Sequence, residues 1–151
     1  MPHITMLYPF RPRSEFEAAA GALSAACGAI PSFEVTLTEF GYFCHGGSSY
    51  TLWLAPEPAE PLVRLQAAML SAVPECDETS RYAGGFTPHL SVGQVREAGK
   101  MERLKKSLQA AWQPLSFRVD SVSMIWRGDP PDDVFRVDRL IPLGGVKGSA
   151  T

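Results

Sequence analysis

One short pattern occurs twice in this chain, and each copy opens a similar series of apolar and polar residues. The triplets His3-Ile4-Thr5 and His89-Leu90-Ser91 each follow a proline. Nearly the same spacing separates Phe33-Glu34-Val35 from Phe117-Arg118-Val119. Fixed-period arrays need three or more units, so a pattern that occurs twice indicates an internal duplication within one fold. The chain is therefore constrained to fold as two related halves.

Hydrophobic periodicity predicts strand, helix, strand, strand in each half, with one further helix between the halves. The expected strands cover 3–10, 33 to the turn at 45–48, 50–55, 89–95, 115–126 and 134–141. The expected helices cover 15–27, 61–73 and 99–112, and a bulge is expected just before Phe40-Gly41. We expect an α+β fold, a single domain over 1–151 with two pseudo-twofold-related β-α-β-β lobes and mostly antiparallel sheets. Lobe one spans about 1–73, lobe two about 88–143, and a C-terminal tail 144–151.

Bulk properties exclude several classes of function. A length of 151 residues suits one domain, and a net charge of −2 argues against binding to long nucleic acid. The three cysteines, Cys27, Cys44 and Cys76, have no metal-type spacing and favour a reducing compartment. No apolar run approaches bilayer length, so we expect no membrane association and a cytoplasmic protein.

The repeated triplet carries chemistry. Side chains two residues apart in a strand share a face, so each histidine points the same way as the hydroxyl that follows it. Two imidazoles on either side of a phosphorus atom suit displacement at a phosphodiester, since one removes a proton and the other returns one. Thr5 and Ser91 could donate to the phosphoryl oxygens. This chemistry requires no metal and no cofactor.

The paired triplets resemble the double motif of the 2H phosphoesterase superfamily, in its 2′-5′ RNA ligase-like (LigT-like) branch. Residues 2–10 are similar to the first motif of that branch, and residues 87–93 to the second. Residues 40–43 and 52–58 also fit the family pattern, so the likeness covers nearly the whole chain.

The resemblance implies a bilobal fold with the active cleft between the lobes. It also implies hydrolysis of 2′,3′-cyclic phosphates at RNA ends or on small nucleotides, with reversible 2′-5′ RNA ligation in some relatives and a place in RNA processing. His3 and His89 take the catalytic positions of the family, and Thr5 and Ser91 its phosphate-binding positions. Sequence does not decide which histidine is the acid.

Other residues are weaker candidates. Tyr82 and Phe86 lie in the loop that enters the second motif and could stack on a base, as could Tyr42 and Phe43. His45 is expected to be a turn histidine in solvent, because no spacing around it matches a metal site. Three further candidates could reach the mouth of the cleft, and sequence does not rank them: Arg11, Arg81 and Arg127.

The chain departs from the family pattern at its start, where relatives usually carry a strand ahead of the first motif. Three explanations are open: a shorter chain with an uncovered sheet edge, a strand supplied by a neighbouring subunit, or a start codon assigned too late. An uncovered edge favours a homodimer. The main functional alternative is a non-catalytic module that binds a nucleotide or an RNA end and keeps the cleft.

Overall fold

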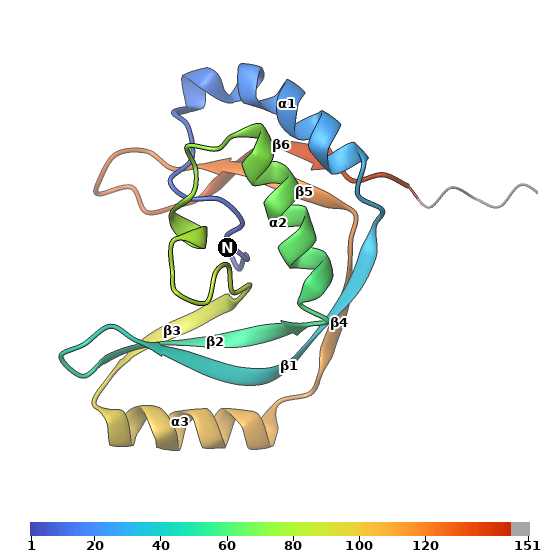
Figure 1. Ribbon diagram of the computed structural model, residues 1–151. Helices are drawn as coiled ribbons and strands as arrows, with labels where there is room; N and C mark the ends of the chain where they lie inside the picture. Colours follow the sequence, from blue (N-terminus) through green and yellow to red (C-terminus); the bar gives the residue numbers. More distant parts are fainter. Residues whose placement is uncertain (146–151) are drawn as a thin grey trace, which may run out of the picture.

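The computed structural model describes residues 1–145 and has the expected α+β composition, with α1 and α2 packed on one side and α3 on the other (Figure 1). Its elements follow in the order η1 (Arg13–Glu15), α1 (Phe16–Gly28), β1 (Phe33–Cys44), β2 (Ser49–Glu57), α2 (Glu60–Ala72), η2 (Glu78–Ser80), β3 (Leu90–Arg96), α3 (Ala98–Ala111), β4 (Leu115–Val119), β5 (Ser121–Trp126) and β6 (Arg136–Pro142). The predicted helices are confirmed, each within two residues of its expected ends.

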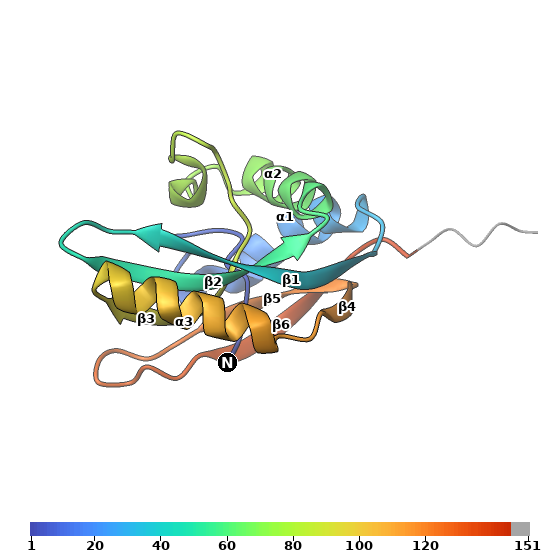
Figure 2. The same cartoon turned by 90° about the horizontal axis from the view of Figure 1, so that it is seen from below.

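A four-stranded antiparallel sheet in the order β3-β2-β1-β4 forms one part of the fold. Helix α3 lies across β1, β2 and β3 (Figure 2) and covers one face. The core beneath it consists of Leu37, Phe40, Leu52 and Leu54, with Leu108 and Trp112 packed against them. The indole Nε1 of Trp112 donates to the carbonyl of Leu37 at 2.8 Å, which ties the end of α3 to the sheet.

A two-stranded antiparallel sheet, β5-β6, forms the other part. Helix α1 packs on α2 and on β6, and both helices contribute side chains to the larger core (Figure 1). This core is apolar and includes Phe16, Leu23, Leu65, Met69, Met124 and Ile141. Two packed bodies with separate cores agree with the expected bilobal fold.

The sheets combine strands from both halves of the chain. Strand β3 of the second half pairs with β2 of the first, and β4 pairs with β1. The expected strand 115–126 is interrupted at Asp120, so that β4 joins the larger sheet and β5 the smaller one. The division into lobes at 1–73 and 88–143 therefore does not coincide with the division into sheets. The reason is that the free edge of β2 offers the ladder partner that β3 needs.

The expected first strand at 3–10 is not a regular strand. Its residues form only two isolated bridges, Ile4 with Leu90 and Tyr8 with Asp77. On the other side of residues 1–7, a cavity of about 360 Å³ separates them from β5. A continuous ladder needs a neighbouring strand at hydrogen-bonding distance, and this segment has none on the side of β5.

Two smaller expectations concern the bulge and the tail. The bulge in β1 is present, at the register shift between Leu37 and Glu39. The tail expected from residue 144 begins later, because Gly144 still donates to the carbonyl of Ile30 at 2.8 Å. Residues 146–151 of that predicted tail lie outside the described part of the chain. Among the helices of residues 1–145, none has both the length and the apolar composition of a membrane span.

Candidate active site

The two repeated triplets lie side by side in the fold. Ile4 and Leu90 form an antiparallel bridge at the outer edge of β3. In an antiparallel bridge the residue before one partner lies beside the residue after the other. His3 is therefore at the same end of the bridge as Ser91, and Thr5 at the same end as His89. The structure thus brings together all four residues expected to carry the chemistry.

Both imidazole rings make the same contact with the main chain. Nδ1 of His3 lies 2.9 Å from the carbonyl oxygen of Met1, and Nδ1 of His89 lies 2.8 Å from that of Thr87. A carbonyl oxygen can only accept, so Nδ1 carries the proton in each ring. When the ring is neutral, its Nε2 therefore has the lone pair that can accept a proton from a substrate or a water.

His89 is held among aromatic side chains from the larger sheet. The ring of Phe43 meets it edge to face with centroids 4.8 Å apart, and the indole of Trp53 lies 6.0 Å away. Trp53 in turn packs against Gly41, where a Cβ would come within 2.6 Å of the indole. Glycine is thus required at position 41 for the indole to approach the strand.

His3 has an aromatic neighbour from the loop between β5 and β6. The ring of Phe135 lies 5.2 Å from it, edge to face, and the guanidinium of Arg127 lies 5.3 Å from the centre of the Phe135 ring. The loop that carries both residues is ordered by Asp132, which accepts from the main-chain N–H of Val134 at 3.0 Å. Each histidine therefore abuts a phenylalanine from the hairpin of the opposite half of the chain.

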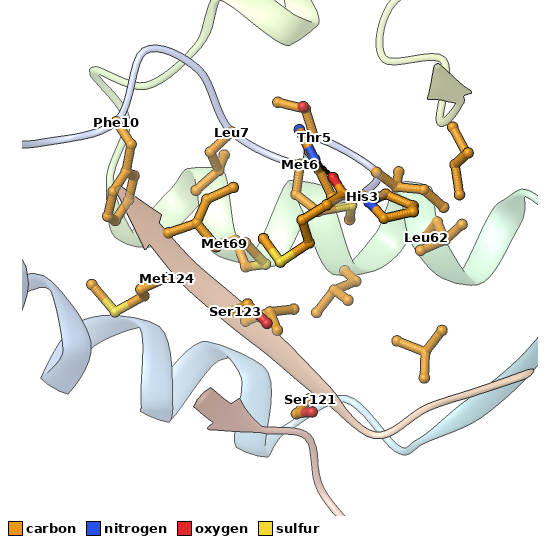
Figure 3. Close-up of a pocket in the computed structure, with 18 of the residues that line it drawn as sticks. His3, Thr5, Met6, Leu7, Phe10, Leu62, Met69, Ser121, Ser123 and Met124 are labelled. Carbon is orange, nitrogen blue, oxygen red and sulfur yellow. Dashed lines mark hydrogen bonds between the residues drawn. The ribbon is translucent and has the colours of Figure 1, made fainter. Parts of the chain in front are cut away.

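A cavity lies beside the first triplet. His3 and Thr5 line it, together with apolar side chains such as Leu7, Phe10 and Met69 (Figure 3). Neither His89 nor Ser91 lines this cavity. We therefore place the candidate reaction site at the bridged triplets and not in the cavity.

The residues expected to stack on a base are separated by the structure. Phe43 lies against His89, as described above. Tyr42 does not, because neighbouring residues of a strand point to opposite faces; its ring contacts Tyr50 at 5.8 Å and Lys105 at 5.6 Å instead. Tyr82 is 73% exposed in the loop before the second triplet, and Phe86 is half-buried.

The three arginines that sequence left unranked now differ clearly. Arg11 pairs with Glu75 at 2.6 Å, and this hydrogen bond lowers the pKa of the Glu75 carboxyl. Arg81 pairs with Asp77 at 2.6 Å and lowers the pKa of that carboxyl in the same way. Arg127 makes no ion pair with any described residue, and its guanidinium lies over the Phe135 ring that contacts His3.

His45 lies in the exposed turn after β1, and its Nε2 is 2.7 Å from the hydroxyl of Thr51. Cys76 is buried in the larger apolar core. Across residues 1–145, no three His, Cys, Asp or Glu side chains lie close enough together to hold a metal ion.

Sequence reasoning missed Trp53, Gly41 and Phe135 as parts of the site. Gly41 within a strand is a signal of close backbone approach, and it lies directly opposite Trp53 in the β1–β2 register. That pair could have been found from the register alone. Phe135 carries no comparable signal, because its position depends on how the loop after β5 folds back.

The bridge between Ile4 and Leu90 brings two histidines and two hydroxyl residues together. The profile of the 2′-5′ RNA ligase superfamily matches residues 1–131. The chain belongs to that superfamily, which confirms the resemblance seen in its motifs.

A known structure supports the same fold. The crystal structure of TT0787 from Thermus thermophilus matches with a TM-score of 0.66 and 22% sequence identity, covering 96% of this chain and 79% of that one. At this identity the likeness shows the fold alone. No curated protein sequence matches the chain closely.

Proposed function

We propose that the protein is a metal-independent phosphodiesterase that hydrolyses a 2′,3′-cyclic phosphate at an RNA end or on a small nucleotide. The observation that carries this proposal is the pair of imidazoles, each with Nδ1 bound to a carbonyl and Nε2 left for chemistry. Membership of the 2′-5′ RNA ligase superfamily supports it independently. If an RNA 5′-hydroxyl replaced water as the nucleophile and the bond from phosphorus to the 3′-oxygen broke, the same forward chemistry would give a 2′-5′ linkage.

In the proposed reaction, one imidazole accepts a proton from water as its oxygen attacks the phosphorus atom. The bond from phosphorus to one ribose oxygen breaks, and the protonated second imidazole gives its proton to that oxygen. The product is a nucleoside monophosphate with one free ribose hydroxyl. Thr5 and Ser91 donate to the non-bridging oxygens, where negative charge develops.

The aromatic surroundings of His89 suit a flat group on the substrate. Phe43 and Trp53 present aromatic surface next to the reacting imidazole, and a nucleobase can stack on such a surface. Tyr82 and Phe86 remain candidates from the loop before the second triplet.

Pairing of two copies along the edge of residues 1–7 also stays a prediction, which sedimentation of the full chain would test.

Turnover of a 2′,3′-cyclic nucleotide tests the proposal. His3→Ala and His89→Ala should each lower kcat by about 10²- to 10⁴-fold, the range expected for loss of a general acid or base. His45→Ala is the matched control, because His45 is exposed in a turn and bound to Thr51. It should retain the rate of the unmodified protein.

Two outcomes would contradict the proposed enzymatic activity or its mechanism. Binding of the nucleotide without turnover would favour the non-catalytic binding module. A rate in either His3→Ala or His89→Ala that equals that of His45→Ala would refute the paired mechanism.

A further inference from the structure

The position of His3 depends on how residues 4–11 are held, since the segment has no regular strand partner. Besides the bridge at Ile4, two hydrogen bonds from the loop around η2 secure its main chain. The hydroxyl of Thr79 donates to the carbonyl of Met6 at 3.2 Å, and the N–H of Glu78 donates to the carbonyl of Tyr8 at 2.9 Å. The loop 75–80 therefore supplies the main-chain hydrogen bonds that a neighbouring strand would supply in a regular sheet.

A buried polar side chain on α2 holds this loop in turn. Gln66 is only 3% exposed, although its helix neighbours Leu65 and Met69 belong to the apolar core. Its Nε2 donates to the hydroxyl of Ser80 at 2.8 Å and to that of Thr79 at 3.4 Å. Burying an amide costs free energy unless the amide is hydrogen-bonded, so a glutamine on this apolar face indicates that its hydrogen bonds are needed there.

The directions of the hydrogen bonds make a continuous relay. The hydroxyl of Thr79 has one proton, and the carbonyl of Met6 can only accept, so that proton points to Met6. The lone pairs of the same oxygen are then available to accept from Gln66. The relay thus runs from the rigid helix α2 through Thr79 to the residue that directly follows Thr5.

We propose that Gln66 is a positioning residue of the site, which acts through Thr79 and the main chain of Met6 to set the placement of Thr5 and His3. This inference rests on the proposed function. It assigns a role to α2, which contributes no side chain to the bridged triplets.

Gln66→Leu removes the amide while keeping the helix apolar. It should lower kcat for a 2′,3′-cyclic nucleotide by about ten- to hundred-fold, because small displacements of reacting groups have effects of that size. Gln109→Leu is the matched control. Gln109 also ties a helix to the main chain, accepting from the N–H of Phe40 at 2.8 Å and donating to the carbonyl of Thr38 at 3.0 Å. Its loss should reduce thermal stability and leave kcat close to that of the unmodified protein.

The relay hydroxyl allows a second comparison that does not depend on how well Gln66→Leu folds. Thr79→Val keeps the shape of the side chain and removes the hydroxyl, whereas Thr79→Ser keeps the hydroxyl. Thr79→Val should lose turnover and Thr79→Ser should retain it. In a His3→Ala background, Gln66→Leu should cause a smaller further loss than it causes in the unmodified protein, since one of the two groups that it positions is already absent.

Titration with inorganic phosphate, followed through the NMR signals of the two imidazoles, separates this inference from the proposed function. In Gln66→Leu, phosphate should shift the His3 signals less than in the unmodified protein and the His89 signals equally. That result supports the positioning role even if no cyclic nucleotide is turned over, in which case only the proposed function fails. Equal phosphate responses in Gln66→Leu and Gln109→Leu, equal rates in Thr79→Val and Thr79→Ser, or additive losses with His3→Ala would each overturn the inference.

Discussion

Replacing Gly41 by alanine tests whether the indole of Trp53 helps to place His89. A Cβ at this position would lie 2.6 Å from Cη2 and Cζ2 of the indole and 2.9 Å from Cε2. Non-bonded carbon atoms pack at about 3.5–4.0 Å, so the ring must move back by roughly 1 Å. The indole packs against Phe43, with ring centroids 5.0 Å apart, and lies 6.0 Å from His89. Its displacement is therefore passed on to the imidazole.

The size of the effect follows from two general costs. Forcing extra volume into a packed contact lowers the free energy of unfolding by about 1–3 kcal/mol. Displacing a reacting group by about 1 Å lowers the rate by up to about 10²-fold. We expect Gly41→Ala to show both, with the loss of rate exceeding what partial unfolding at the assay temperature explains.

Gly93→Ala is the matched control for this substitution. Gly93 lies on the neighbouring part of the same sheet, and a Cβ there would meet nothing within 4 Å. It should be as stable as the unmodified protein or slightly more so, because glycine in a strand carries an entropic cost of about 0.5–1 kcal/mol. Denaturant unfolding and initial rates on a 2′,3′-cyclic nucleotide measure both quantities. If Gly41→Ala matched Gly93→Ala in stability and in rate, the proposed contact between Trp53 and the site would be refuted.

Three further predictions concern ionisation, packing and metal removal. Arg11 lowers the pKa of Glu75 below its ordinary value of 4.5, so the pair stabilises the fold above that value and the stabilisation is lost as the pH falls through the lowered pKa. The thermal midpoints of Arg11→Met and the unmodified protein should thus differ at pH 7 and converge at pH 3. A difference of equal size at both pH values would contradict this. Gly144→Ala should lower the free energy of unfolding by about 1–3 kcal/mol, because its Cβ would lie 2.5 Å from the carbonyl oxygen of Gly28; an unchanged denaturation midpoint would show that the chain yields there. Turnover should persist after dialysis against EDTA, and loss of activity that zinc or magnesium restores would establish a metal-dependent reaction instead.

Local patterns were sufficient to predict the helices and the main turn. Pro61 lies in the first turn of α2, where a missing N–H is no loss. Gly46 and Gly47 both adopt positive φ, at 79° and 57°, in the hairpin between β1 and β2. These features depend on one or two residues and their immediate neighbours. They can therefore be predicted without knowledge of the rest of the fold.

Strand pairing could not be predicted from local patterns in the same way. Alternation shows which side chains share a face, but it does not identify the neighbouring edge. The expected strand 3–10 has good alternation and yet forms only single bridges, since its partners are the edge of β3 and the loop 75–80. Likewise the sequence 115–126 reads as one strand, while the break at Asp120 lets its two pieces join different sheets.

The residues of the candidate site also fall into those that local sequence predicts and those that depend on the packing of distant segments. The four motif residues were predicted because each triplet carries its own chemistry. The residues around them come from other strands and loops, as Phe43 and Phe135 show. Strand alternation would have separated Phe43 from Tyr42, since only one of two neighbours can face the histidine, although it could not have said which.

The duplicated triplet does not by itself assign the acid and the base. Both histidines use Nδ1 in the same contact with a carbonyl, so each presents an equivalent Nε2. Their surroundings differ. His89 lies against Phe43 and Trp53. His3 lies against the ring of Phe135, over which the guanidinium of Arg127 is placed. A substrate with a flat group at one end and a charged group at the other would enter such a site in one orientation. In the proposed reaction, that orientation determines which imidazole faces the departing oxygen. We therefore expect the asymmetry around the pair, and not the repeat, to set the roles of the two histidines.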